Sequence, residues 1–430
     1  MTMFRRRVVV TGLGVVSPIG NDVAAFWSSL LDGRSGAAPI AAFPVGGAAP
    51  AYAAEVKGFT PESAGLPRKR VKMMGRQAQL AFAAASAASL DAALPGAGVL
   101  ATRLGMLLGV GMLNADVDEF GRAFHAASVA AGADFDEVAF GRSGAPALFP
   151  LWLLRHIPNL AAAHAAIALD AQGPSNTIAT GCVAAANAIG EAARIIGRGE
   201  ADVILAGGTD ARVSPLATIR YRDLGWLATR EDAEPATVSA PFDEAAAGFV
   251  NGEGAGVVVL EALEHARARG AHVHAEVAGY AAANDACGML TPDRAGAALH
   301  QAISRCLVRA DISRGAVDVV FAPAPSVAPF DRATAAALAS AFGGSHAPAI
   351  TATRSLLGHT HAASSALDCV AAVKSIGDSR IPATANLRRP IATLPFVTDA
   401  ARHAAIRTAL VGAYGFGGHA AALALRGYDQ

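Results

Sequence analysis

The sequence is poor in charge and has little lysine. Charged residues make up 16% of its 430 residues, and 35 basic residues balance 35 acidic ones. A chain without net charge has no overall field that would attract nucleic acid or an anionic membrane. Lysine occurs only at Lys57, Lys69, Lys72 and Lys374, so arginine carries nearly all of the positive charge. Because 53% of the residues are hydrophobic, the chain can bury a large core, which excludes wholesale disorder.

Cysteine is also scarce. Cys182, Cys287, Cys306 and Cys369 show neither a CxxC pair nor a Cys/His ligand spacing. This argues against a disulfide framework and a zinc site, so we predict no metal and a reducing, cytoplasmic compartment. The alternative that one of these cysteines is a single reactive thiol remains open.

Long apolar runs that could span a membrane are missing. The uncharged stretches 36–54 and 171–190 contain proline, glycine and polar residues, which makes them poor spans. Arg5, Arg6 and Arg7 precede an apolar run that resembles a signal peptide. Gly12 and Gly14 interrupt this run and no small-residue cleavage site follows, so we interpret it as a strand.

Three common catalytic or nucleotide-binding motifs are absent. Gly12-Leu13-Gly14 lacks the third glycine of a dinucleotide fingerprint, and the glycine cluster 251–256 has no Lys-Ser/Thr after it. No G-x-S-x-G elbow occurs. Dinucleotide binding, phosphate cradling and conventional serine hydrolysis are therefore disfavoured.

Short apolar runs alternate with longer alanine-rich segments of helical pattern, which is typical of a layered α/β protein. We predict strands at 7–11, 104–110, 175–179, 202–207, 254–261, 274–280, 317–322, 349–353, 408–412 and 420–425. We predict helices at 22–31, with Asn21 as the N-cap, and at 76–92, 183–198, 263–269, 332–342 and 360–376.

The chain is predicted to divide near Gly270, because a similar cadence of strands and helices lies on each side of it. We expect an N-terminal half, 1–270, with a nucleophilic cysteine, and a C-terminal half, 271–430, with a histidine and a glycine-rich turn. Segment 113–150 has no clear period and predicts an excursion or cap within the first half.

The sharpest local feature is Thr180-Gly181-Cys182, between an apolar strand and a helix that runs to about Gly197. Backbone N–H groups and the dipole at a helix N-terminus stabilise a thiolate. The pattern therefore predicts a nucleophile with a lowered pKa, with nothing acidic nearby in the sequence to oppose it. The alternative is a small buried residue, since most free cysteines are of this kind.

Two further features could supply chemistry. His359 and His361 open a second alanine-rich helix, where a spacing of two residues directs side chains apart. We therefore predict no shared metal and at most one functional histidine; a core or cap histidine is the alternative. The turn Gly415-Phe416-Gly417-Gly418 could bring backbone N–H groups to a reacting oxygen, or could be a plain hairpin.

A basic cluster places five positive charges within nine residues: Arg68, Lys69, Arg70, Lys72 and Arg76. Such a run is usually a solvated face. Its functional interpretation is a docking patch for an acidic partner, which would act on association rate and register.

Together these motifs resemble those of the β-ketoacyl carrier-protein synthases, and most closely the elongating, type II condensing enzymes. The resemblance spans nearly all 430 residues. It is carried, in order, by 8–20, the Cys182 turn, Ala206-Gly207-Gly208-Thr209-Asp210, Pro241-Phe242-Asp243, Gly248-Phe249-Val250, Gly252–Gly256, Gly358-His359 and Gly415–Gly418.

The resemblance implies a thiolase fold, with two duplicated α/β halves in a five-layer αβαβα arrangement. It also implies a homodimer, or a heterodimer with a second ketosynthase subunit. In that family the cysteine at the position of Cys182 takes an acyl chain from the phosphopantetheine thioester of acyl carrier protein. Malonyl carrier protein is then decarboxylated, and its carbanion attacks the acyl-enzyme.

The resemblance further implies roles for the other motifs. Backbone N–H groups of Cys182 and Phe416 would form the oxyanion hole, and Phe416 would gate the second substrate. The basic segment 68–76 would contact the acidic carrier protein. No bound cofactor is expected, because the pantetheine arm arrives on that partner.

The sequence departs from the family pattern of two histidines and a lysine. His359 fits the second histidine, but 320–326 occupies the place of Asn-Ala-His-Gly-Thr-Ser, so Pro323 replaces the first. Proline offers neither a side-chain proton nor a backbone N–H. Arg354 stands where lysine is usual, and Asp368 where glutamate is common. We therefore predict that Cys182 is acylated while malonyl decarboxylation is impaired.

Three functions fit this sequence. The first is a divergent β-ketoacyl synthase of fatty-acid or polyketide synthesis, with water or His361 in place of the lost histidine. The second is a non-condensing acyltransferase that moves a preformed acyl group. The third is a noncatalytic pairing subunit resembling chain-length factors. Cys182 favours the first two, and the absent histidine favours the last two.

Overall fold

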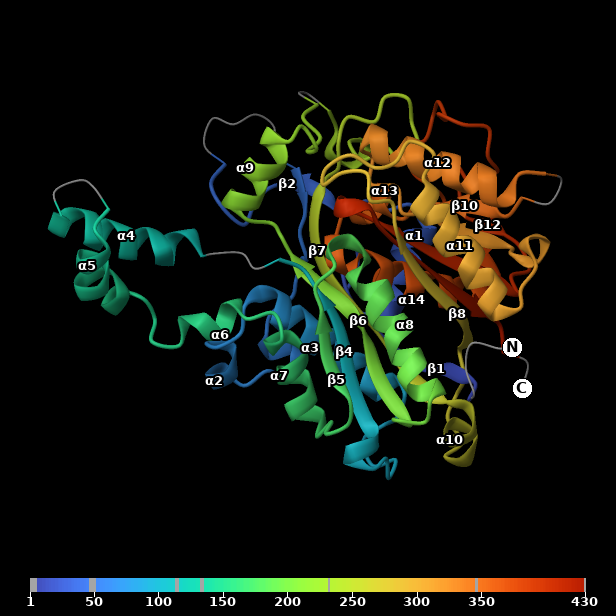
Figure 1. The fold of residues 1–430 in the computed structure, drawn as a ribbon, viewed down its shortest axis with the longest axis horizontal. Helices are drawn as coiled ribbons and strands as arrows, with labels where there is room; N and C mark the ends of the chain where they lie inside the picture. Colours follow the sequence, from blue (N-terminus) through green and yellow to red (C-terminus); the bar gives the residue numbers. More distant parts are fainter. Residues whose placement is uncertain are drawn as a thin grey trace.

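The computed structural model describes residues 6–45, 52–112, 116–131, 135–230, 233–344 and 347–428. Ten of its strands lie in the order β10-β9-β13-β14-β8-β1-β7-β6-β4-β5 across one mixed sheet (Figure 1). They are β1 Val8–Val16, β4 Leu104–Val110, β5 Ser175–Ile178, β6 Val203–Ala211, β7 Asn251–Ala262, β8 Ala275–Asn284, β9 Val319–Phe321, β10 Ala349–Thr351, β13 Thr408–Tyr414 and β14 His419–Arg426. All ten strands expected from the sequence are confirmed.

Four short strands complete the set in the described residues. β2 (Ala37–Pro39) pairs with β3 (Tyr52–Ala54), which adds to β7. β11 (Arg380–Ile381) and β12 (Arg402–His403) form a separate pair.

The sheet consists of two halves with the same strand pattern. In the first half β1 is antiparallel to β7 and β7 to β6, whereas β6, β4 and β5 are parallel. In the second half β8 is antiparallel to β14 and β14 to β13, whereas β13, β9 and β10 are parallel. Named strands of the two halves pair with each other at β1 and β8, through Val9–Glu276 and Val10–Ala275. The sheet is therefore a duplicated unit.

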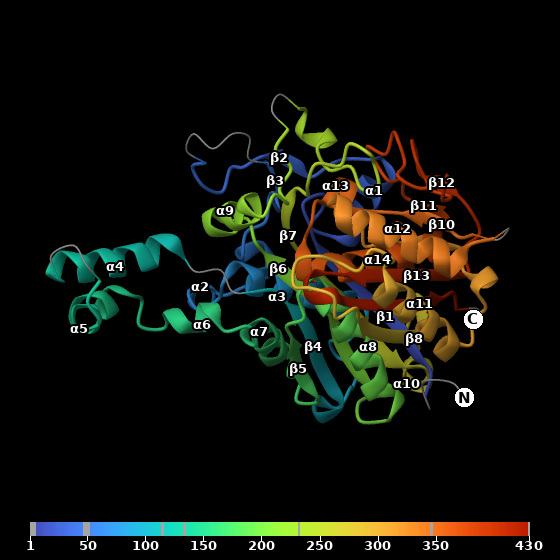
Figure 2. The same cartoon turned by 45° about the horizontal axis from the view of Figure 1, so that its top comes forward.

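Helices form three layers around these two half-sheets (Figures 1 and 2). α3 and α7 pack on the first half, α11 and α12 lie on the far side of the second, and α8 and α14 lie between them. The helices are α1 Val23–Leu31, α2 Arg68–Val71, α3 Arg76–Asp91, α4 Val117–Ala131, α5 Glu137–Ala139, α6 Trp152–His156, α7 Leu160–Leu169, α8 Ala184–Gly197, α9 Pro215–Asp223, α10 Leu263–Ala268, α11 Ala297–Ala310, α12 Ala328–Phe342, α13 Arg354–Leu357 and α14 Ser364–Asp378.

Alternating side chains build the cores between these layers. On β6, Ile204 and Ala206 join the central core with α8 and α14, whereas Leu205 joins the outer core beneath α3. On β13, Val411 faces the central core and Leu410 the core beneath α11. Because strands buried on both faces need apolar residues at every position, they appear in the sequence as continuous apolar runs.

The paired glycines of β1 have a packing role. A Cβ at Gly14 would lie 1.9 Å from the carbonyl oxygen of Ala84, and one at Gly12 would lie 2.4 Å from that of Ala88. Only glycine therefore lets α3 lie this close to β1.

Three helix starts differ from the sequence prediction. α12 begins at Ala328 and not at 332. The side chain of Asp22, and not that of Asn21, caps α1 by accepting a 2.8 Å hydrogen bond from the backbone N–H of Ala25. Asn21 instead donates to the carbonyl of Lys57. α14 begins at Ser364 and not near 360, so the two histidines precede it.

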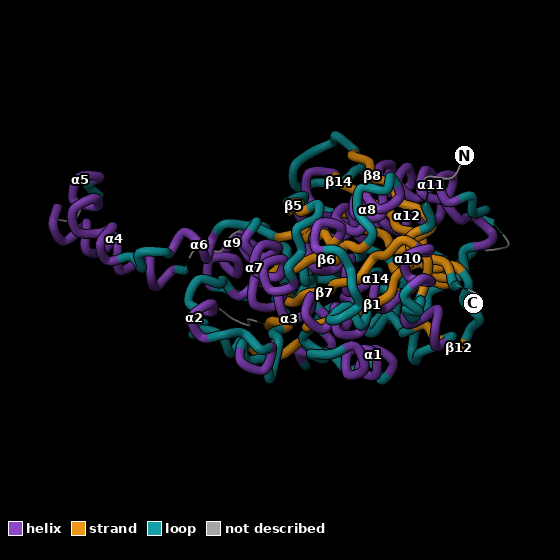
Figure 3. Tube along the Cα trace, turned by 90° about the horizontal axis from the view of Figure 1, so that it is seen from below, coloured by secondary structure: helices purple, strands orange, loops and turns teal. Residues whose placement is uncertain are grey.

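The segment predicted as an excursion projects from the body of the molecule. α4, α5 and α6 extend away from the sheet (Figures 1 and 3). Residues 113–115 and 132–134 of this segment lie outside the described residues. In the part of the chain that is described, no helix is long and apolar enough to cross a membrane.

Candidate active site

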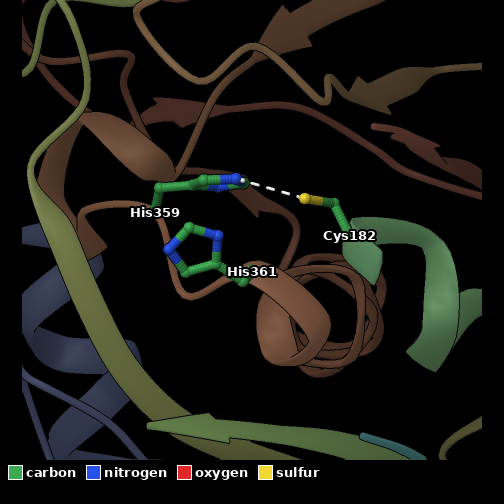
Figure 4. A group of neighbouring side chains, drawn as sticks. All are labelled: Cys182, His359 and His361. Carbon is green, nitrogen blue, oxygen red and sulfur yellow. Dashed lines mark hydrogen bonds between the residues drawn. The ribbon is translucent and has the colours of Figure 1, made fainter. Parts of the chain in front are cut away.

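Cys182 lies in a tight turn between β5 and α8. β5 ends at Ile178, Gly181 adopts a φ of +60°, and Cys182 sits in the short 3-10 turn η5 (Gly181–Val183). In the second half, β10 is the counterpart of β5, and the chain that follows it carries His359. The duplication therefore brings these two turns together. The Sγ atom of Cys182 lies 3.4 Å from Nε2 of His359 (Figure 4).

Both members of this pair are buried. Each is only 4% exposed, and the backbone N–H of His359 donates to the carbonyl of Val250 at 2.7 Å. Nδ1 of His359 has no hydrogen-bond partner in the described structure, so its ring is oriented mainly by packing against Phe249. The arrangement can exchange a proton between thiol and imidazole.

Burial dominates the acidity of the thiol. It raises the pKa of Cys182 to about 11, while the positive charges of Arg212 and Arg354 act in the opposite direction. The predicted lowering of this pKa is therefore wrong, because desolvation of the thiolate outweighs the helix N-terminus. Asp210, distant in sequence, also raises the pKa, so the fold brings an acidic group to a thiol that has none close to it along the chain.

His361 lies beside His359 rather than away from it. The two ring centroids are 4.3 Å apart, and one ring nitrogen from each lies within 4.8 Å of the other and of Sγ of Cys182. The prediction that the two rings diverge is wrong because they sit in a turn, where Gly358 and His361 have φ values of +65° and +47°. The spacing argument against a shared ion therefore fails.

A buried polar network holds His361. Its Nε2 is 2.8 Å from Oδ1 of Asn251, whose Nδ2 donates to the carbonyl of Arg212 at 2.6 Å. Arg212 pairs with Asp210 at 3.1 Å and donates to the hydroxyl of Tyr221 at 2.7 Å. Sequence analysis missed Asn251, Arg212 and Tyr221; a polar residue opening the glycine-rich β7 was the only available signal.

The glycine-rich turn contacts Cys182. A Cβ at Gly415 would lie 2.9 Å from Cβ and 3.4 Å from Sγ of Cys182, so the backbone passes directly beside the thiol. Phe416 stacks on Trp226, with ring centroids 4.2 Å apart and planes within 1°. The turn is anchored where the N–H of Gly417 donates to the carbonyl of Met289 at 2.8 Å. The turn between β13 and β14 therefore contributes backbone to the site beside Cys182, in addition to connecting the two strands.

The chain matches known protein-family models over most of its length. Residues 5–266 match the description "Beta-ketoacyl synthase, N-terminal domain", and residues 274–388 match "Beta-ketoacyl synthase, C-terminal domain". The chain belongs to the β-ketoacyl synthase family.

Curated members of the family align with this chain over nearly its whole length. It is 34% identical to 3-oxoacyl-[acyl-carrier-protein] synthase 2 of Synechocystis, covering 99% of both chains. It is also 34% identical to an oxytetracycline polyketide putative beta-ketoacyl synthase 1 of Streptomyces rimosus, covering 98% of this chain and 97% of that one.

Solved ketosynthases share its thiolase fold. The ishigamide ketosynthase/chain length factor superposes with a TM-score of 0.86 at 32% identity, covering 99% of this chain and 100% of that one. A beta-ketoacyl synthase from Burkholderia phymatum gives a TM-score of 0.87 at 27% identity, with the same coverage.

The position where the family resemblance expects the first histidine is apolar here. Pro323 is buried two residues after the end of β9, and a Cβ at neighbouring Gly412 would lie 2.9 Å from its Cδ. Arg354 reaches the same place, because its Nη1 donates to the carbonyl of Ala322 at 3.0 Å. Arg354 also pairs with Asp368 at 3.2 Å, which leaves it a fixed positive charge near the thiol.

The basic cluster is split by the structure. Arg68, Lys69 and Lys72 are exposed on and after the short α2, and Arg70 is half-buried. Arg76 instead pairs with buried Glu253 at 2.9 Å, so its charge is already compensated.

Proposed function

We propose that this β-ketoacyl synthase family chain takes an acyl group from an acyl carrier protein onto Cys182 and is impaired in malonyl decarboxylation. One observation carries the proposal. The thiol of Cys182 is paired with His359 at 3.4 Å and flanked by the Gly415 turn, whereas the end of β9 offers Pro323.

Acyl loading needs only groups that the site contains. Sγ attacks the thioester carbonyl, its proton passes to Nε2 of His359, and the pantetheine thiol leaves with that proton. The backbone N–H groups of Cys182 and Phe416 would stabilise the oxyanion. Exposed Arg68, Lys69 and Lys72, with Arg70, would dock the acidic carrier protein, which also supplies the pantetheine arm.

Decarboxylation needs a donor for the enolate oxygen of the malonyl thioester. Proline supplies none. Loss of one preorganised donor costs about 10²–10³ in rate, or roughly 3–4 kcal/mol. We therefore expect the two half-reactions to differ strongly in rate.

Intact-mass spectrometry tests this directly. The protein is incubated with acyl-loaded and then malonyl-loaded carrier protein, beside the Pro323→His and Cys182→Ala variants. We expect acyl mass on Cys182 while the malonyl carrier stays intact, and faster decarboxylation in Pro323→His. Normal decarboxylation by the unchanged protein would overturn the proposal.

A second candidate is a pairing subunit of a heterodimeric ketosynthase. It is supported by the similarity to the ishigamide ketosynthase/chain length factor. It is also supported by apolar side chains that are exposed on the projecting arm, which is the part of the chain formed by α4, α5 and α6. Such a subunit would make no product alone and would fold stably only with its partner. Retained Cys182 favours the first proposal, because a purely structural subunit has no chemical need for the thiol.

A further inference from the structure

The protonation pattern of His361 follows from its hydrogen-bond network. Nδ2 of Asn251 donates to the carbonyl of Arg212, so Oδ1 of Asn251 faces His361. Reversing the amide would place two acceptor oxygens 2.6 Å apart. Oδ1 can only accept, so Nε2 of His361 carries the proton and Nδ1 carries a lone pair.

The ring of His361 is held in one position. It stacks on Tyr221 with centroids 5.1 Å apart and planes 13° apart, and Phe249 meets it edge-on at 5.4 Å. The N–H of Ala362 donates to Asp210 at 3.2 Å. The left-handed φ of +47° at His361 is costly for a residue with a side chain, and such strain persists only where the surroundings enforce it.

Nδ1, the second ring nitrogen of His361, faces Cys182. Figure 4 shows one nitrogen of the His361 ring directed toward Cys182 and His359. The other ring nitrogen, Nε2, is the one that contacts Oδ1 of Asn251. The sulfur and one nitrogen of each imidazole lie within 4.8 Å of one another. Burial and the neighbouring positive charges hold the pKa of His361 well below its usual value, so the lone pair is available at neutral pH.

A lone pair on Nδ1 does not serve the decarboxylation step or the attack of the carbanion. An enolate needs a hydrogen-bond donor, and a carbanion brings no proton that must be removed, so this tautomer cannot replace the missing histidine. A base beside an acyl-enzyme does suit a nucleophile that carries an O–H or N–H bond.

We propose that His361 is a general base that lets an alcohol, an amine or water attack acyl-Cys182. This rests on the acyl-loading step of the proposed function. The acceptor oxygen or nitrogen forms a bond to the thioester carbonyl carbon, and its proton moves to Nδ1 of His361. The C–S bond then breaks, and its electron pair leaves on Sγ, which takes the proton from Nδ1. The products are an ester, an amide or an acid, and the free thiol.

The test measures decay of a preformed acyl-enzyme. Cys182 is octanoylated with the octanoyl thioester of N-acetylcysteamine, the excess reagent is removed, and intact mass follows deacylation in water alone or with glycerol, ethanolamine or pantetheine. We expect His361→Leu to slow transfer to water, glycerol and ethanolamine by about 10²–10⁴-fold. Transfer to pantetheine should change only a few-fold, because a thiol ionises without a strong base.

Two further variants separate the base from the fold. Asn251→Leu removes the oxygen that holds the proton on Nε2 of His361, and it should slow acyl transfer to water, glycerol and ethanolamine. Asn251→Asp keeps a hydrogen-bond acceptor facing Nε2 and should retain most of the transfer rate. His403→Leu, on exposed β12, serves as the control.

Equal slowing with all acceptors, or no slowing in His361→Leu, would overturn the assignment. Loading from carrier protein is measured separately. If loading from carrier protein fails, the proposed function is contradicted. The deacylation rates can still be compared in that case, because the acyl-enzyme is made from a small thioester.

Discussion

At the residue scale, the reactivity of Cys182 is set by burial rather than by its place before a helix. Its thiolate must form where water is excluded, and the charges of Arg212 and Arg354, together with a backbone hydrogen bond at Cys182, compensate that charge only in part. In the proposed function, attack on a thioester needs the proton to leave as the new bond forms, and Nε2 of His359, 3.4 Å from Sγ, would accept it.

We predict that alkylation of Cys182 by iodoacetamide rises steadily from pH 7 to 10. Because burial raises its pKa to about 11, the thiolate fraction is small at pH 7 and grows tenfold per pH unit. Peptide mass spectrometry measures the rate, with exposed Cys287 as an internal reference. Arg354→Met should slow the reaction further. A plateau below pH 8 would contradict the burial argument.

At the element scale, the close contact of α3 with β1 depends on glycine. A methyl group at Gly14 would overlap the carbonyl oxygen of Ala84, so Gly14→Ala forces helix and strand apart. We predict a loss of about 3 kcal/mol in the free energy of unfolding, measured by urea titration. Gly121→Ala is the matched control: its Cβ meets no atom within 4 Å in helix α4, so stability should hold or rise. Equal effects would refute the packing role.

A second element-scale contact ties the starts of β4 and β6. Asp202 accepts hydrogen bonds from Arg103 at 2.9 and 3.0 Å and from Arg6 at 3.0 Å, which lowers its pKa to about 2. A lowered folded-state pKa adds stability above the unfolded value near 4, and this is lost as the pH falls toward 2.

We therefore predict that Asp202→Asn destabilises the protein by about 2 kcal/mol at pH 7, with the difference shrinking below pH 4. Thermal or urea unfolding across pH 2.5–7 measures it. Asp223→Asn, at an exposed position, is the control and should change little. A difference that stays constant with pH would show that the pair contributes no titratable stability.

At the scale of the whole molecule, the projecting arm has apolar side chains without cover. Phe135, Val138 and Leu153 are 52%, 61% and 53% exposed, and β5 leaves a sheet edge unpaired among the described residues. Exposed apolar patches and free edges are typical of interfaces. Both features support pairing with a second copy or with another ketosynthase subunit.

We predict that light scattering of the purified chain gives more than the 43.3 kDa of one copy, or that a 1:1 complex forms with a co-expressed ketosynthase subunit. The double variant Val138→Glu, Leu153→Glu should weaken that assembly. Val308→Glu, at an 80% exposed position on α11, should leave it unchanged. A protein that is monomeric and does not bind the co-expressed subunit would contradict the prediction.

Much of the fold could be predicted from the sequence because its signals are local. Strands buried on both faces give apolar runs, and alanine-rich helices give a period of about 3.6, so each of the ten main strands was placed. The motif order around Cys182, His359 and Phe416 identified the family. The cap at Asp22 was missed by one residue, since both Asn and Asp are good caps and only the hydrogen bond to Ala25 distinguishes them.

The sequence by itself determined the family and the layered fold, because family motifs and apolar periods are local, and it pointed to Cys182 and His359 as separate candidates from the turns that carry them. Tertiary structure alone decided the acidity of Cys182 and the position of His361. Burial is a property of the packed molecule, and Asn251, Arg212 and Tyr221 reach His361 from distant segments. The tautomer of His361 and its direction toward the thiol therefore exist only once the two halves have come together.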